Sequence, residues 1–150
     1  MLQRKQSVFL FVAFVLSVVC LCLPVGQLEP AGMGIGPKVY NLWISGNGYH
    51  DFSACPLFVL LSLSGLVSIV TVFLYRNRML QSKMCVCNIF LLLAWYVVYV
   101  VLIKKVASPD ATFHVSFALC LPMICILLNL MARKGILNDE KLVRAADRIR

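Results

Sequence analysis

The sequence predicts an all-α membrane protein: a four-transmembrane-helix bundle with a short cytoplasmic C-terminal amphipathic helix and a small β-hairpin in its first exported loop. Two observations lead to this fold class. The 150 residues are 61% hydrophobic and only 13% charged, which is far more apolar than a soluble domain. Four stretches also approach the roughly 20 apolar residues that a helix needs to cross a bilayer. They cover residues 7–23, 56–75, 84–103 and 115–131.

None of these four stretches contains an Asp, Glu, Lys, Arg or His residue. A helix that is apolar on every side is stable in lipid, whereas a helix at the surface of a soluble protein keeps a polar face. The first stretch follows Arg4 and Lys5, as the apolar region of a signal peptide would, but it is longer than usual and no small-residue cleavage site follows it. We therefore expect it to be retained, and residues 1–150 to form a single membrane domain.

The positions of the Lys and Arg residues predict the orientation, because positive charges near a span resist translocation and stay in the cytoplasm. Eleven of the 14 lie near the N-terminus, between the second and third spans, or in the tail. These are Arg4, Lys5, Arg76, Arg78, Lys83, Arg133, Lys134, Lys141, Arg144, Arg148 and Arg150. Both termini are thus expected in the cytoplasm, with an exported loop at 24–55 and a cytoplasmic tail at 132–150. This topology accounts for the net charge of +8, so we expect the lipid bilayer as partner and no nucleic acid.

The exported loop holds six of the eight glycines, a composition that favours turns over helix. Within it, the range Lys38–Ile44 is rich in β-branched and aromatic residues. The following Ser45-Gly46-Asn47-Gly48 is a turn signal that predicts a short hairpin with Tyr49–Phe52. A lid over a ligand is the alternative role for this loop.

Polar residues inside the spans indicate how the helices pack. A stripe of small side chains at helical spacing on the second span would let another helix approach closely; it consists of Ser64, Gly65, Ser68 and Thr71. Asn88 and Asn129 are expected at similar depth in antiparallel helices, where their side chains would form an interhelical hydrogen bond. Pro122 is expected to kink the fourth span.

The tail is predicted to form a separate short helix that begins at an Asn138 cap. Its apolar face would consist of Leu142, Val143, Ala146 and Ile149. So short a helix is only marginally stable alone in water, so this face must rest on another surface. The bilayer interface is the simpler expectation, and another membrane protein or a cytoplasmic partner is the alternative.

No residue pattern predicts a catalytic site, a bound cofactor or a metal site. The seven cysteines include two C-x-C pairs, Cys20 with Cys22 and Cys85 with Cys87, but neither pair has the further ligands of a zinc site. The two histidines, His50 and His114, lie outside the spans, whereas a haem bound between helices needs histidines within them. No ionisable residue lies at membrane depth, where it would mark an ion path.

Three segments of the chain resemble a known family. They are the opening Met1-Leu2-Gln3-Arg4-Lys5-Gln6, the Leu74-Tyr75-Arg76-Asn77-Arg78-Met79-Leu80-Gln81 step, and the closing stretch from Asp139 to Arg150. They are similar to the small membrane proteins of Bacteroidetes grouped as domain-of-unknown-function family 4293. The resemblance implies four spans and a location in the bacterial inner membrane, and it supplies no catalytic residue.

We therefore expect an integral membrane protein that is not an enzyme, and that scaffolds or modulates a membrane partner through its tail and loop. Two alternatives remain open. The first is a small transporter of a neutral or apolar solute, which needs no buried charge. The second is a thiol-disulfide membrane oxidoreductase, although such enzymes use C-x-x-C pairs and this chain has none.

Overall fold

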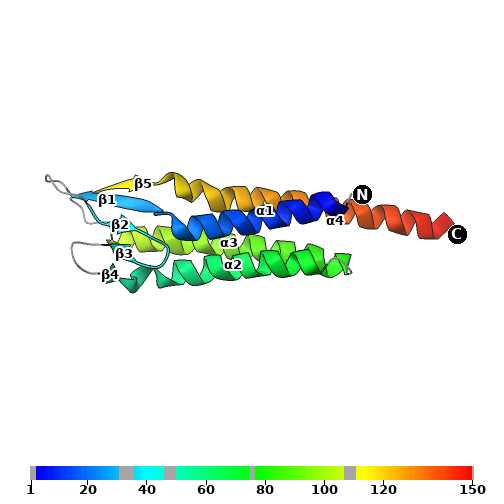
Figure 1. Ribbon diagram of the computed structural model, residues 1–150, viewed down its shortest axis with the longest axis horizontal. Helices are drawn as coiled ribbons and strands as arrows, with labels where there is room; N and C mark the ends of the chain where they lie inside the picture. Colours follow the sequence, from blue (N-terminus) through cyan, green and yellow to red (C-terminus); the bar gives the residue numbers. More distant parts are fainter. Residues whose placement is uncertain (1–2, 31–35, 46–49, 75–76, 107–110, 150) are drawn as a thin grey trace.

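A computed structural model describes residues 3–30, 36–45, 50–74, 77–106 and 111–149. Four helices lie side by side along the long axis of the molecule (Figure 1). They are α1 (Gln3–Cys22), α2 (Cys55–Phe73), α3 (Arg78–Val106) and α4 (Cys120–Ile149). α1 and α3 each pack against both α2 and α4. Both termini lie at one end of the molecule, here called the terminal end, and a small β-sheet covers the other, the sheet end.

Three of these helical segments are long and apolar enough to cross a membrane: Phe52–Phe73, Arg78–Val106 and Phe117–Val143. They overlap the second, third and fourth predicted spans. The first predicted span corresponds to α1, whose described apolar part, Gln6–Cys22, is shorter. Large apolar side chains are exposed on the outside of all four helices, including Phe11, Phe90 and Leu127. These properties are consistent with a membrane protein.

The fourth helix differs from the prediction at both ends. Residues 111–115 form a strand, and α4 begins only at Cys120 after a short 3-10 turn. Pro122 is therefore in the first turn of α4, where its missing N–H would have no partner within the helix, so the reason for predicting a kink does not apply. At the other end α4 continues without a break to Ile149. The prediction of a separate tail helix capped by Asn138 was thus wrong, since Asn138 lies inside α4.

The sheet is antiparallel, with five strands in the order β4-β3-β2-β1-β5. The strands are β1 (Gly26–Pro30), β2 (Lys38–Val39), β3 (Ile44–Ser45), β4 (His50–Asp51) and β5 (Ala111–Val115). The predicted small hairpin is confirmed in part, because Ile44 pairs with Asp51 and Ser45 with His50; residues 46–49 of its turn lie outside the described residues. The predicted strand Lys38–Ile44 was wrong in its extent, since Lys38–Val39 forms a separate strand that pairs with Ile44–Ser45. The sequence reasoning missed β1 and β5, which pair along their full length and so join the connection α1–α2 to the connection α3–α4.

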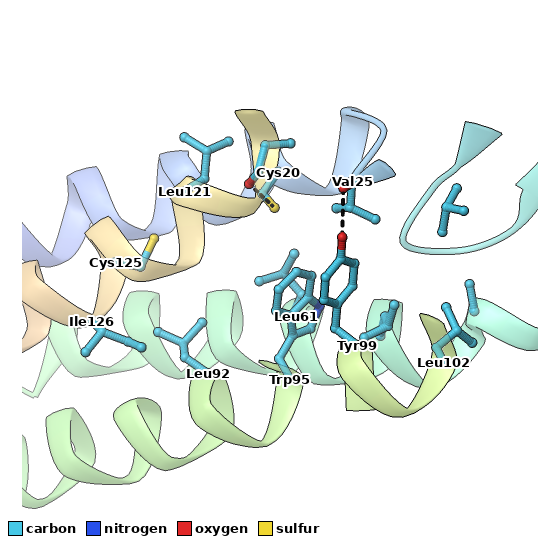
Figure 2. Packing of buried hydrophobic residues seen from close by; sticks show 14 of the residues in the cluster. Cys20, Val25, Leu61, Leu92, Trp95, Tyr99, Leu102, Leu121, Cys125 and Ile126 are labelled. Carbon is cyan, nitrogen blue, oxygen red and sulfur yellow. Dashed lines mark hydrogen bonds between the residues drawn. The ribbon is translucent and has the colours of Figure 1, made fainter. Parts of the chain in front are cut away.

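The main hydrophobic core lies between the helices near the sheet end (Figure 2). Its largest side chain, Trp95, is completely buried, and its ring stacks on Tyr99 with centroids 5.4 Å apart. The sheet contributes Val39 and Ile44 to the same core. A smaller cluster, separate from this core, lies between α1, α3 and α4 and consists of Leu10, Cys85, Ala132 and Ile136. The sheet is therefore packed onto the helices as part of one structure.

Candidate functional site

The two asparagines predicted to pair are both buried and lie close together in a cluster of polar side chains. Asn88 Nδ2 donates to Asn129 Oδ1 at 3.3 Å and to Ser68 Oγ at 2.8 Å. Ser64 Oγ donates to Asn88 Oδ1 at 2.6 Å. Asn129 Nδ2 donates to the carbonyl of Cys125 at 2.8 Å. The cluster joins α2, α3 and α4, and every partner comes from the protein itself.

All four members of the small-residue stripe on α2 are buried: Ser64, Gly65, Ser68 and Thr71. They do not all serve close helix packing. Ser64 and Ser68 bind Asn88, while the Thr71 carbonyl accepts from Gln81 Nε2 at 3.1 Å. Gly65 lies against α1, yet a Cβ added there would be 3.7 Å from Phe14, an ordinary contact distance. The stripe therefore acts mainly as a set of hydrogen-bond partners for α3.

No buried side-chain nitrogen or oxygen among the described residues is without a hydrogen-bond partner. The same part of the chain contains no group of three or more His, Cys, Asp or Glu side chains placed to hold a metal ion. All seven cysteines are free; Cys20, Cys85 and Cys125 are buried and the other four are exposed. Cys125 Sγ lies 3.4 Å from the Ala13 carbonyl and 3.8 Å from Ser17 Oγ. This thiol thus joins α4 to α1 as a small packed side chain.

At the sheet end, one polar side chain from the loop enters the core. Asn41 is completely buried; its Nδ2 donates to the Cys20 carbonyl at 2.7 Å, and its Oδ1 accepts from Trp95 Nε1 at 3.2 Å. Tyr99 OH donates to the Val25 carbonyl at 3.0 Å (Figure 2). Asn41 also satisfies a carbonyl in the last turn of α1, which has no partner within the helix. These hydrogen bonds hold the loop against α1 and α3, so that the loop covers the sheet end of the helices.

The terminal end is held together by polar contacts of Asp139. Gln6 Nε2 donates to Asp139 Oδ2 at 2.6 Å, and Arg78 Nη1 lies 3.4 Å from the Asp139 carbonyl. Gly135 lets α1 approach, because a Cβ there would come within 3.0 Å of Gln6 Cγ. Asp139 therefore connects α4 with the beginnings of α1 and α3.

Beyond Asp139, α4 extends past the other helices (Figure 1). Ala132, Ile136 and Val143 recur at spacings of four and seven residues and so lie on one face of α4. Ala132 and Ile136 are buried, but Val143 is 46% exposed and Leu142, beside it, is 62% exposed. The side chains of Ala146 and Ile149 lie outside the described residues. The face that packs against the other helices thus continues as an exposed apolar surface.

A groove of about 500 Å³ lies where this extension leaves the other helices. It is bounded by the beginning of α3 and by α4. Its lining consists of Asn77, Arg78, Met79, Leu80, Lys83, Glu140 and Val143. Two cations, one carboxylate and exposed apolar side chains therefore meet at the terminal end.

The fold defines a small helical protein with three membrane-length apolar helices and a sheet over one end. Residues 2–149 match the family described as domain of unknown function 4293 (DUF4293). Because the match covers almost the whole chain, the protein belongs to this family, as the three sequence segments indicated. No curated protein matches the chain.

Sequence reasoning missed two residues that organise the ends, Asn41 and Gln6. Asn41 stands among aromatic residues in a glycine-rich loop, where a polar residue is ordinarily solvated. Gln6 precedes the first apolar stretch directly, and its partner Asp139 is 133 positions away. Only the glycine at 135, a poor helix former within a helical stretch, was a sign of a close approach there.

Proposed function

We propose that this protein spans the bacterial inner membrane four times and acts, without catalysis of its own, as a scaffold or modulator of a membrane partner that binds the extension of α4. The observation that carries the proposal is the unbroken course of α4 past the other helices. A separate short tail could turn and lie on the membrane. A continuous helix instead points along the axis of its own span, away from the lipid.

The four spans are supported by the packing of α1. Although its apolar part is the shortest, α1 packs against α2 and α4 and contributes Leu10, Ala13 and Cys20 as completely buried side chains. A cleaved signal peptide would have no such role. The charge distribution supports the orientation, because 11 of the 14 Lys and Arg residues lie near the N-terminus, between the second and third spans, or in the tail. The sheet would then lie outside and the α4 extension in the cytoplasm.

The exposed surface of the extension favours a helical partner. Leu142 and Val143 continue the face that already packs against helices. In water, an apolar face of this kind is stabilised when another amphipathic helix covers it. We therefore propose that the partner binds through a helix with a complementary apolar stripe, which lies in the cytoplasm next to the membrane.

Site-specific photo-crosslinking in intact cells tests this proposal. A photoreactive residue at Leu142 should yield a discrete adduct with a partner, and Leu142→Ser should remove that partner from a mild-detergent pull-down. Leu137 provides the matched control, because it is also an exposed leucine of α4 but lies about 140° away around the helix. Equal crosslinking at both positions, or an unchanged partner in Leu142→Ser, would contradict the proposal.

Labelling with a membrane-impermeant thiol reagent tests the orientation, in a cysteine-free background. Lys38→Cys, in β2, should react in intact cells. Lys141→Cys, in α4, should react only after the membrane is opened. The reverse pattern would place the sheet in the cytoplasm and overturn the assignment.

A further inference from the structure

We propose that the groove at the terminal end binds an anionic phospholipid, with the headgroup phosphate held by Arg78 and Lys83. This inference rests on the membrane embedding in the proposed function, but not on the partner of the α4 extension. The groove has a volume of about 500 Å³ and is formed by the beginning of α3 and by α4. That space is sufficient for a glycerophosphate headgroup and the start of its acyl chains.

The groove lies at the depth of the lipid headgroups. Lys83 directly precedes Met84, where the apolar range 84–103 begins, and Arg78 lies about 9 Å before Met84 along α3 at 1.5 Å per residue. The headgroup layer extends roughly 5–8 Å beyond the hydrocarbon on each side. Lys83 therefore lies at the inner boundary of this layer, and Arg78, whose backbone lies at its outer edge, has a side chain long enough to reach the phosphates. Each cation would interact with a phosphate in a partly dehydrated layer.

The position of the Arg78 guanidinium is restrained by the fold. Its Nη1 lies 3.4 Å from the Asp139 carbonyl, and Asp139 is itself bound to Gln6. A guanidinium has five N–H donors, so the contact leaves others for a phosphate. A restrained cation loses less conformational freedom on binding than one that is fully mobile.

The apolar part of the lining fits the acyl chains. Met79 and Leu80 are 50% and 46% exposed, and both border the same groove as the two cations. A free phosphate ion would gain nothing from contact with these apolar side chains, whereas a phospholipid buries apolar surface next to its charged headgroup. Glu140 also borders the groove, so the lining carries one net positive charge. One such charge suits a headgroup with one negative charge.

Lipid binding to the purified full chain in detergent tests the assignment, with retained lipid measured by native mass spectrometry. Phosphatidylglycerol should bind more tightly than phosphatidylcholine. Each of Arg78→Gln and Lys83→Gln should weaken phosphatidylglycerol binding about fivefold. Glu140→Gln should strengthen it, since a like charge is removed. A gain of this kind cannot come from a chain that fails to fold.

The matched control is the pair Lys104→Gln and Lys105→Gln, which removes two cations from the last turn of the same helix α3. It should leave binding unchanged. Equal loss from both pairs would show general attraction of lipid to charge and would overturn the site. Equal binding of the two lipids would do the same. Displacement of the lipid by inorganic phosphate at millimolar concentration would identify a small-anion site and overturn the lipid assignment.

The result is separable from the test of the α4 extension. Leu142→Ser should remove the partner from the pull-down and leave the lipid titration unchanged, whereas Lys83→Gln should weaken lipid binding and leave the partner in the pull-down. An unchanged partner in Leu142→Ser, together with the expected weakening of lipid binding in Lys83→Gln, would reject the proposed partner site and leave the lipid site standing.

Discussion

The two ends of the molecule are closed in different ways. At the sheet end a loop contributes buried side chains to the core, and Asn41 connects the end of α1 to Trp95 on α3. At the terminal end the connections are side-chain contacts around Asp139, next to an exposed helix and a groove. The difference teaches that the sheet end is fixed by buried side chains, whereas the terminal end leaves apolar and charged side chains exposed, where the proposed partner and lipid would bind.

The largest expected effect is at the sheet end. Trp95→Ala should lower the free energy of unfolding by about 3–5 kcal/mol, since it leaves a cavity and removes the partner of Asn41. Unfolding in mixed micelles measures the change. Val97→Ala is the control on the same helix, because Val97 is 64% exposed, and it should cost less than about 1 kcal/mol. If Trp95→Ala lowered the free energy of unfolding as little as Val97→Ala does, the core around Trp95 would contribute little to stability.

A smaller loss is expected from Asn41→Ala, about 2–3 kcal/mol, because the Cys20 carbonyl and Trp95 Nε1 lose their partner. Hydrogen exchange should also become faster in the strands of the sheet while α3 remains protected. Asn138→Ala makes the same change at an exposed position of α4 and should have almost no effect. Unchanged exchange in Asn41→Ala would show that the loop is fixed by its apolar residues alone.

The buried amide cluster should contribute less again. Asn88→Ala is expected to cost about 1–2 kcal/mol, because hydrogen bonds between membrane helices average roughly 0.6 kcal/mol each. A double-mutant cycle with Asn129→Ala should give a coupling free energy of about 0.5–1 kcal/mol. Zero coupling would mean that the 3.3 Å contact does not stabilise the fold.

The smallest effects are expected at two glycines within helices, Gly65 in α2 and Gly135 in α4, each of which lies against α1. Gly65→Ala should be neutral or stabilising by up to about 1 kcal/mol, since the methyl group fits and Ala favours helix. Gly135→Ala should gain less, because its Cβ would come within 3.0 Å of Gln6. In a Gln6→Ala background the two substitutions should become equally favourable. Thermal unfolding of the two single variants, of Gln6→Ala and of the two double variants measures these effects. An equal effect of both glycine substitutions in the unmodified chain would contradict the steric argument.

Helix number and approximate position could be predicted from the sequence because each depends on local composition. Long uncharged stretches predicted α2 to within two residues at each end and the central part of α3, which begins six residues before the predicted range and ends three after it. The Asn-Gly turn signal predicted the β3–β4 hairpin. The asparagines could be placed near each other because helical rise is regular, so equal distances along antiparallel helices give equal depths.

The remaining features depend on partners that are distant in sequence. The β1–β5 pairing joins residue 26 to residue 115, and β1 has no alternating pattern that would indicate a strand. The end of the fourth span was misjudged because a change from apolar to charged composition was interpreted as a break in the helix. Composition changes at that point, but Gly135 is only a mild helix breaker, so the helix continues.

The continuity of α4 connects the two surfaces of the membrane in the proposed topology. Only Ser116 and one 3-10 turn separate β5 from a helix of 30 residues, which is about 45 Å long. An α-helix resists bending and twisting because successive turns are hydrogen-bonded to one another. A rotation at Cys120, next to the sheet, would therefore reach the other end of α4, which is cytoplasmic in the proposed topology, with no break in the helix to absorb it.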